Sequence, residues 1–496
     1  MLSLPRSWRA ALALMAAGAW GAFLGIWHLQ GHGSVLDRVE APMTDWRLLI
    51  AGERPALDNI VIVAIDDETV RRTGVYPLPR ALLAQLVDRL TDSGAKAIAL
   101  DMLFLDRGAD EADAQLANAV RRAQAVIGAA ALFGRGDAFA DTDLGAGLAL
   151  ALPVAEKIVL PVSPIAEAGA IGLVNISADH GGTPRYVPLL IRSGGELLPC
   201  FALRAAARAA STDAEIETNA IRIGAARSAV DLGYHLPLRF FGPRGTIPTV
   251  SAQTILDGAG LEAVRGRIVL VGATAIGTAD TFATAFDPLF PGAEVEATAI
   301  AHLVNGGGLI RDLTTRRIDL AASVILPILT VLALSMRQIS VGIALATAPL
   351  VIWLALVIFA FTRNYWLAMA LPLAATLPVG LLFGALRLWL EQRSKRRMRV
   401  QREAFRRFQS PANRRHNCSR STLLAGAGAA ECRDSLRRPL RFHRFERAAR
   451  CTAHARFPEG VSLDHRRRGA ALQWLRREFH GRRRDAGLRS AGAAPG

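Results

Sequence analysis

The sequence is poor in charge and in cysteine. Only 21% of its 496 residues are charged, whereas 51% are hydrophobic, and this balance is apolar for a soluble protein of that size. Of the four cysteines, Cys200 lies in the body of the chain and the other three lie beyond residue 411, so no disulfide framework is implied. The motifs H-E-x-x-H, C-x-x-C and G-x-S-x-G are absent. Zinc-protease, zinc-cluster and hydrolase functions therefore have no motif to support them.

The net positive charge of the chain comes from its tail. The net charge is +16, but residues 391–496 hold 28 Lys and Arg against 9 Asp and Glu, so the remaining residues sum to −3. The basic tail interleaves aromatic and basic residues at 473–484 without a regular period. Nucleic-acid binders use such interleaving, but the missing period indicates incidental composition. We expect no nucleic-acid partner.

Four long uncharged apolar runs predict membrane-spanning helices. A helix rises about 1.5 Å per residue, so roughly 20 residues cross a hydrocarbon core about 30 Å thick. The first run contains A-G-A at 17–19, which resembles a signal-peptide cleavage site, but its apolar residues continue to Trp27. This favours an uncleaved anchor. The predicted spans are residues 10–29, 318–336, 340–361 and 366–388.

The basic residues beside the spans predict the orientation. Arg6 and Arg9 precede the first span, Arg337 lies between the second and third, and residues 393–399 follow the fourth. Cytoplasmic loops are enriched in Lys and Arg, and four spans place these three positions on one side. Arg316 and Arg317 oppose this assignment but are outnumbered. We expect residues 30–317 on the outer side, which is the periplasm if the cell is Gram-negative.

The segment between the first two spans reads as α/β. Residues 59–66 and 96–104 are apolar runs typical of buried parallel strands, and residues 80–95 between them have helical spacing. This is a βαβ unit. The alternation continues through further expected strands and a helix, as layered α/β domains require, at residues 185–192, 234–242, 267–274 and 295–307.

Acidic residues follow two of these strands. Asp66 and Asp67 end the first strand and Asp101 lies near the end of the second. Parallel sheets bind ligands at this edge, so the sequence predicts a carboxylate-lined crevice there. Arg80, at the start of the intervening helix, is expected to pair with Asp66 or Asp101 or to hold an anion. The alternative is a structural ion-pair cluster that fixes the βα loops.

Three separated motifs carry a family resemblance. The stretch D-W-R-L-L-I-A-G-E-R-P, continued by residues 59–104, resembles the opening of the type-2 CHASE domain. G-L-V-N-I-S-A-D-H-G-G-T-P-R at 172–185 is similar to the family's Gly-Asn-Asp-Gly-Arg pattern, and residues 267–307 resemble its closing motif. The matching positions are Gly172, Asn175, Asp179, Gly182 and Arg185, then Gly272, Asp280, Pro288, Pro291, Gly292 and Glu294.

The resemblance implies an extracytoplasmic sensor in a bacterial receptor. Such sensors are attached to nucleotide cyclases, histidine kinases and other outputs, and a three-span bundle follows them as it does here. The family's ligands are poorly defined, so the external ligand stays unknown. The resemblance adds Asp179, Arg185 and Asp280 to the candidate ligand-binding residues. No catalytic residue and no metal ligand is assigned.

The segment after the last span predicts a signalling helix. Residues 389–411 carry apolar side chains at heptad-like intervals, which favours a parallel helix pair and hence a homodimer. R-E-A-F-R-R-F-Q-S-P at 402–411 resembles the entry to a class III adenylate or guanylate cyclase domain. That domain needs paired aspartates to bind two Mg²⁺ and ATP. Residues 412–496 have no apolar strand run and scattered acidic residues, so we expect them to be disordered and without cofactors.

Two explanations fit this tail. A frame shift near Pro411 turns a GC-rich message into Arg and Ala, at the point where a catalytic domain should begin. Alternatively, the tail is a genuine basic arm that docks on anionic lipid or RNA. Under either explanation, Mg²⁺ and ATP are cofactors only if another reading frame encodes a cyclase domain.

The favoured interpretation is a bilayer-embedded sensory receptor with an α/β external domain and a truncated or corrupted output. One alternative is an output-less binding protein that hetero-dimerises with an intact receptor, and another is the sensor of a histidine kinase. A third is an external enzyme that uses Asp66, Asp67 and Asp101 with a metal. The predicted parts are a cytoplasmic N-terminus at 1–9, the sensor at 30–317, the four spans, the linker at 389–411 and the tail at 412–496.

Overall fold

The computed structural model describes residues 6–134 and 152–408. Two units divide the chain, Met1–Arg396 and Arg397–Gly496, and the description below concerns the first except where α12 continues into the second. The predicted disordered tail at 412–496 lies outside the described residues.

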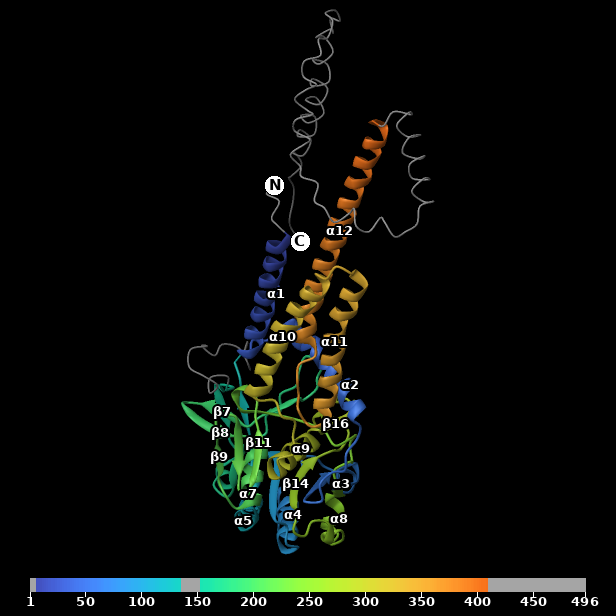
Figure 1. Cartoon of the computed structure of the whole chain (residues 1–496). Coiled ribbons are helices and arrows are strands. Elements are labelled where there is room, and N and C mark those ends of the chain that lie inside the picture. The colour runs from blue at the N-terminus through green and yellow to red at the C-terminus, as the bar shows by residue number, and fades with distance from the viewer. Residues whose placement is uncertain (1–5, 135–151, 409–496) are drawn as a thin grey trace, which may run out of the picture. The chain divides into compact units, whose positions relative to one another are not determined.

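A mostly parallel seven-stranded sheet forms the centre of the external domain (Figure 1). Its order is β13-β1-β14-β2-β3-β4, and β5 also pairs with β3. Only the β3–β4 pair is antiparallel. Every residue of β1 is buried, which explains its continuous apolar sequence. The strands are β1 (Ile60–Ile65), β2 (Ala97–Leu103), β3 (Val126–Leu132), β4 (Lys157–Val159), β5 (Ala170–Leu173), β13 (Thr249–Ser251) and β14 (Ile268–Ala273).

Helices cover both faces of this sheet. Alternate residues of each strand point to opposite faces, and two apolar cores result. One core packs α4 (Arg80–Asp92), α5 (Asp110–Ala123) and α8 (Ala252–Leu256) on one face. The other packs α7 (Phe201–Ala210) and α9 (Gly292–Asn305) on the opposite face. The predicted α/β class and βαβ unit are confirmed.

The edge at the ends of β1, β14 and β2 is a topological switch point. The helix α9 after β14 lies on one face, whereas α4 after β1 and α5 after β2 lie on the other. The strand β14 lies between β1 and β2. Where adjacent strands send their helices to opposite faces, a crevice opens at their carboxyl ends.

The two strands predicted at residues 185–192 and 234–242 are shorter than expected. The run 185–192 divides into β6 (Tyr186–Pro188), which pairs with β12 (His235–Pro237), and β7 (Leu190–Ser193), which pairs with β8 (Glu196–Pro199). Proline lacks the amide that a strand ladder requires, and Pro188 and Pro237 stand at these ends. A further small sheet comprises β9 (Ala214–Ile216), β10 (Ala220–Ile223) and β11 (Ala226–Ala229). The other short elements are α3 (Asp67–Thr73), α6 (Ser163–Ala166), η2 (Leu232–Tyr234), η3 (Leu261–Ala263), β15 (Thr281–Phe282) and β16 (Phe290–Pro291).

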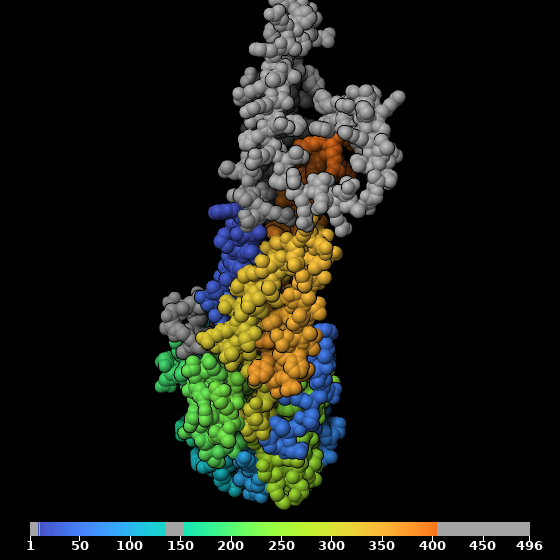
Figure 2. All heavy atoms as spheres, in the orientation of Figure 1, coloured from blue at the N-terminus to red at the C-terminus, as the bar shows by residue number. Residues whose placement is uncertain are grey.

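Within residues 6–134 and 152–408, four helices are long and apolar enough to cross a membrane. They are α1 (Arg6–Leu29), α10 (Leu313–Leu334), α11 (Ile339–Thr362) and α12 (Ala370–Phe408). One precedes the α/β domain and three follow it, as the sequence predicted. In the space-filling view, α1 (blue) lies against α10 (yellow) (Figure 2).

Glycines bring α1 and α10 together. A Cβ added at Gly21 would lie 2.0 Å from the Ser323 carbonyl oxygen, so only glycine permits this approach. The Ser323 hydroxyl donates to the Gly21 carbonyl at 3.1 Å. The N-terminal span is therefore packed against the first span of the C-terminal bundle.

A helix that the sequence did not predict follows the first span. The helix α2 (Val35–Ala51) begins with a capping box in which Ser34 and Asp37 satisfy each other's backbone amides. Its buried residues include Thr44, Arg47 and Leu48. It connects the α/β domain to the segment between α11 and α12 and to the start of α12, as described below.

Candidate functional site

Asp66 and Asp67 fix the loops at the sheet edge. The Asp66 carboxylate caps α3 by accepting from the Thr69 amide at 2.9 Å, and it accepts from the Ser251 hydroxyl at 3.0 Å. The Asp67 carboxylate accepts from the Ile276 amide at 3.1 Å. These contacts tie the loop after β1 to those of both neighbouring strands, which is the structural alternative considered for these residues.

The pairing expected for Arg80 is wrong. Its guanidinium forms an ion pair with Asp113 and donates to the Asp106 carbonyl, and it contacts neither Asp66 nor Asp101. The reason is topological, because α5 follows β2 onto the same face as α4. This places Asp113, in the first turn of α5, beside the first residue of α4.

Asp101 lies at the switch point. It pairs in register with Gly272 of β14, and a Cβ added at Gly272 would lie 3.6 Å from an Asp101 carboxylate oxygen and 2.7 Å from the Ala293 Cβ. The first turn of α9 therefore packs closely against Gly272, next to Asp101. Asp280 adjoins it, since its carbonyl accepts from the Gly292 amide at 2.9 Å. Burial, and then the Asp280 charge, raise the pKa of Asp101 to about 7.

Glu296 completes this group. It lies one helical turn after Ala293, on the same side of α9, and is 0% exposed. Neither of its carboxylate oxygens has a hydrogen-bond partner among residues 6–134 and 152–408. Burial, and then the Asp101 charge, raise the pKa of Glu296 well above its usual range, against the influence of the Ala202 amide at the start of α7.

We call Asp101, Asp280 and Glu296 the edge cluster. Within the described parts of the chain, no ion pair involves any of its three carboxylates, and no group of three potential ligands is arranged to hold a metal ion. Like charges without a cation disfavour the ionised state. The chemistry that this arrangement supports is proton uptake near neutral pH.

Asp179 and Arg185 meet away from the sheet edge. Arg185 donates two hydrogen bonds to Asp45 of α2 at 2.7 and 2.9 Å and a third to Asp179 at 2.6 Å. The Asp179 carboxylate also accepts from the Gly181 and Thr183 amides. Burial would raise the pKa of Asp179, but the Thr183 amide and Arg185 hold it below its usual range. These residues fasten the loop before β6 to α2.

A buried ion pair joins the α/β domain to α10. Asp231, which caps η2, accepts from two guanidinium nitrogens of Arg316 at 2.6 and 2.8 Å. Arg316 also donates to the His28 carbonyl at the end of α1, at 2.7 Å. Burial acts to raise the pKa of Asp231, but Arg316 and Arg311 hold it below its usual range. One guanidinium thus connects three parts of the chain.

A second buried arginine lies beside the first. Arg311, which is 4% exposed, approaches Asp319 at 3.2 Å and donates to the Trp366 carbonyl at 2.6 Å. Asp319 accepts from the Ala368 amide at 2.8 Å. These contacts join the linker before α10 to the segment between α11 and α12.

The third connection runs through α2. Glu40 accepts from the Met369 and Ala370 amides at 2.9 and 2.7 Å, which places a carboxylate at the positive end of the α12 dipole. Glu40 also pairs with Arg47, whose guanidinium donates to the Leu367 carbonyl at 2.7 Å. We call the connected charges the junction network. Its members are Glu40, Asp45, Arg47, Asp179, Arg185, Asp231, Arg311, Arg316 and Asp319.

The sequence reasoning missed most of this network. From the sequence, Arg316 was only a charge that opposes the predicted membrane orientation, whereas the structure pairs it with Asp231. One signal was available, because Asp319 falls inside a predicted span. An ionisable residue in such a place usually marks a functional or paired site.

The fold and the junction network define the class of protein. An α/β domain is bracketed by helices that qualify as membrane spans and is bonded to them through buried charges, as a receptor requires. A family model described as the CHASE2 domain matches residues 18–336. The chain belongs to the CHASE2 domain family, and it is a sensory receptor with an extracellular CHASE2 domain. Comparisons with curated proteins and with solved structures gave no match.

The matched range covers both groups of residues described above. It begins within α1 and ends two residues after α10, so it includes the edge cluster and every member of the junction network. The backbone groups of residues 366–370 to which the network binds lie outside it.

Proposed function

We propose that this receptor lies in a bacterial inner membrane with residues 30–317 on the periplasmic side, and that it transmits a signal through α10–α12 to a cytoplasmic output. The observation that carries the proposal is the junction network. Buried ion pairs stabilise little compared with well-packed apolar residues, but they fix one specific arrangement of the elements they join. Here they join the domain to α1, α10 and α12 at once.

The network offers a path for small movements. A displacement of η2 moves Asp231 and with it the first turn of α10. A displacement of the loop before β6 moves Arg185, Asp45 and α2, and Glu40 of α2 binds the first amides of α12. Packed, bistable interfaces of this kind convert sub-ångström changes into helix shifts.

We propose that detection involves Asp101 and Asp280 of the edge cluster. The other five candidate residues, Asp66, Asp67, Arg80, Asp179 and Arg185, are each engaged by intramolecular partners. Asp101 and Asp280 lack such partners among the described side chains and lie at the edge where α/β sheets bind ligands. A change in their charge reaches α9 directly.

For the output, we propose an ancestral class III cyclase whose catalytic domain has been replaced after a frame shift near Pro411. The composition of residues 412–496 and the resemblance of residues 402–411 support this. Resequencing the coding DNA across codons 400–430 and translating all three frames tests it. A neighbouring frame that continues with paired aspartates is expected, and a domain in no frame would refute it.

A chimera tests transmission separately. Residues 1–411 are fused to an intact class III catalytic domain, and cyclic nucleotide production is measured in membranes with Mg²⁺ and ATP. We expect Arg316→Met and Asp101→Asn to change the activity per folded receptor, whereas Arg317→Met does not. If all three chimeras match the parent, and removal of residues 30–317 also has no effect, the domain is not a sensor for α12.

We propose a homodimer, because parallel α12 helices would bring two outputs together. Co-purification of two differently tagged copies of this chain is the expected result. Recovery of an intact receptor in place of the second copy would favour the hetero-dimerising alternative.

A further inference from the structure

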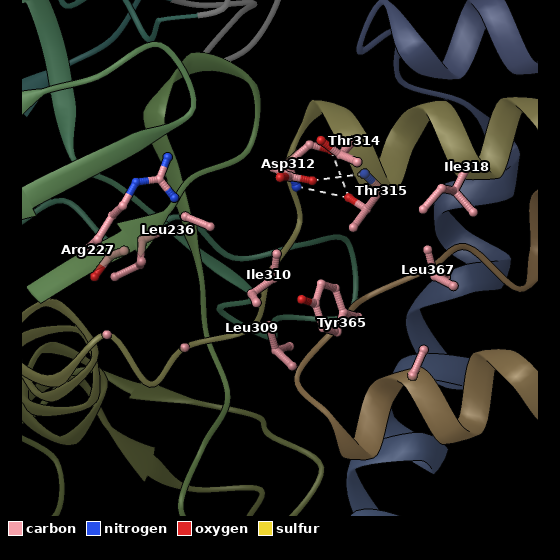
Figure 3. A pocket seen from close by; sticks show the side chains of 15 residues that line it. Arg227, Leu236, Leu309, Ile310, Asp312, Thr314, Thr315, Ile318, Tyr365 and Leu367 are labelled. Carbon is pink, nitrogen blue, oxygen red and sulfur yellow. Dashed lines mark hydrogen bonds between the residues drawn. The ribbon is translucent and has the colours of Figure 1, made fainter.

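A cavity of about 520 Å³ lies where the α/β domain meets the spans (Figure 3). One wall is formed by β11, β12 and the linker 306–312. The opposite wall is formed by the first turns of α10, the end of α11 and the segment before α12. Its size falls within the range of about 300–1,000 Å³ typical of small-molecule sites. The labelled lining residues include Leu236, Leu309, Ile310, Ile318, Tyr365 and Leu367.

More of the lining surface is apolar than polar, and the charged side chains of the lining have partners. Leu236, Leu309 and Leu367 are 1%, 2% and 5% exposed, so they form a buried floor. Asp312 and Thr315 hydrogen-bond to each other's amides in a capping box (Figure 3). Arg227 at the rim pairs with Glu217. Among the described lining residues, no charged side chain lacks a partner, so the cavity does not require an ionic ligand.

The mouth lies beside the start of a candidate membrane span. The candidate span of α10 starts at Leu313, and the lining residues Thr314 and Ile318 lie in its first two turns. Tyr365 and Ile318 are 47% and 43% exposed. An exposed tyrosine beside the end of a span is typical of the level of the lipid headgroups. An apolar cavity that opens there faces hydrocarbon on one side and headgroups on the other.

We propose that this cavity binds one acyl chain of a membrane amphiphile from the leaflet beside the external domain. The chain lies on Leu236, Leu309 and Ile310, and the headgroup remains at the rim near Thr314 and Tyr365. The occupant is a lipid because the cavity adjoins a candidate span, offers apolar side chains for an acyl chain beside hydroxyl groups for a headgroup, and contains no unmatched charge among the described lining residues.

Occupancy would act on the linker between the domain and α10. Ile310 donates to the Asn364 carbonyl at 2.7 Å and accepts from the Trp366 amide at 3.0 Å, and the next residue, Arg311, belongs to the junction network. An acyl chain against Ile310 stabilises this arrangement. The proposal goes beyond the receptor function, since binding is measured without any output and either can fail alone.

Photolabelling of the full chain tests the proposal. The chain is placed in phosphatidylcholine nanodiscs containing a trace of phosphatidylcholine with a diazirine on its acyl chain, and labelled peptides are quantified. Two variants fill the cavity from opposite walls, Ala229→Trp on β11 and Ala360→Trp on α11. Matched controls place tryptophan outside the lining on the same elements, Ala226→Trp and Ala344→Trp. Gel filtration and circular dichroism establish that each variant is folded.

We expect label in the peptides that carry residues 306–318 and 360–367, with at least a fivefold loss in each filled variant and none in either control. Label on the exposed face of α11 serves as the internal standard for bulk lipid. If both folded filled variants keep the parental labelling, or if label at the cavity merely matches the bulk-lipid standard, the proposal is overturned. If neither filled variant folds, competition decides. A saturable decrease of cavity label by unlabelled lysophosphatidylcholine supports the site, and its absence refutes it.

Discussion

The junction network and the edge cluster of this receptor are built in opposite ways. In the junction network each central carboxylate faces an arginine, as Asp231 faces Arg316 and Asp179 faces Arg185. In the edge cluster the charges that act on Asp101 and Glu296 are those of other carboxylates, since Asp280 acts on Asp101 and Asp101 acts on Glu296. Paired charges hold elements in one arrangement across a wide pH range, whereas Asp101 and Glu296, whose pKa values are raised, lose a proton as the pH rises through those values. The contrast suggests that one region is built to connect and the other to respond.

Breaking the junction should give the largest effect. We expect Arg316→Met to lower the free energy of unfolding by about 3–5 kcal/mol, because the buried Asp231 charge is left without a partner. Denaturant unfolding of the purified chain in detergent measures it. The neighbouring Arg317→Met, at an exposed position, is the control.

A double variant sharpens this result. Asp231→Leu combined with Arg316→Met removes both charges, so most of the loss should be recovered. A double variant as unstable as Arg316→Met alone would contradict the ion-pair explanation.

The α2 connection should have a smaller effect. Glu40→Gln keeps an acceptor for the Met369 and Ala370 amides but leaves Arg47 uncompensated, and we expect a loss of about 2–3 kcal/mol. The same substitution at the exposed Glu196 should change stability little. Equal losses at both positions would place Glu40 outside the network.

The edge cluster should respond in the opposite direction. A carboxyl whose pKa is raised on folding stabilises the fold while protonated, and this contribution is lost as pH rises from about 4 through about 7. We expect Asp101→Asn to raise the Tm at pH 7.5 by roughly 4 °C and to change it little at pH 4.

Asp179→Asn provides the opposite sign. The pKa of Asp179 is lowered on folding, so its contribution is present at neutral pH and is lost as pH falls below its unfolded value. This variant should therefore lower the Tm at pH 7.5 and converge on the parent in acid. If Asp101→Asn and Asp179→Asn shift the Tm in the same direction at pH 7.5, the contrast between the two regions fails.

Exposed ion pairs should matter least. Arg72 bonds to Glu68 and Asp257 on the surface of the domain, and solvent screens such pairs. We expect Arg72→Ala to cost less than about 1 kcal/mol by the same unfolding assay. A loss as large as that of Arg316→Met would show that burial does not separate the two kinds of pair.

Local sequence patterns predicted the elements but not the connections. The strand at 59–66, the helix at 80–95 and the strand at 96–104 follow from periodicity, and the four apolar runs follow from length. The pair Asp231–Arg316 spans 85 positions in the chain, and no local pattern relates them. The same limit explains Arg80, whose partner depended on which face of the sheet α5 would cover.

The candidate site was predicted in part. Its place at the carboxyl ends of β1 and β2 follows from the βαβ rule, and Asp101 was identified there. Glu296 was missed because a single acidic residue in an apolar helical stretch is usually a surface residue. The structure shows instead that α9 is buried on nearly all sides, Glu296 included. The strand insertion that places β14 between β1 and β2 is what brings α9 to Asp101.

The glycine contact between α1 and α10 has a consequence for biosynthesis. Gly21 and Ser323 are 302 positions apart, so at about 5–20 residues per second α1 exists for roughly 15–60 s before its partner is made. During that interval its glycine face is turned to lipid while the domain that follows is exported and folds. The helix α1 must therefore not pair with another helix before α10 is made. Until then it presents a small-residue surface that other nascent helices in the membrane can also approach.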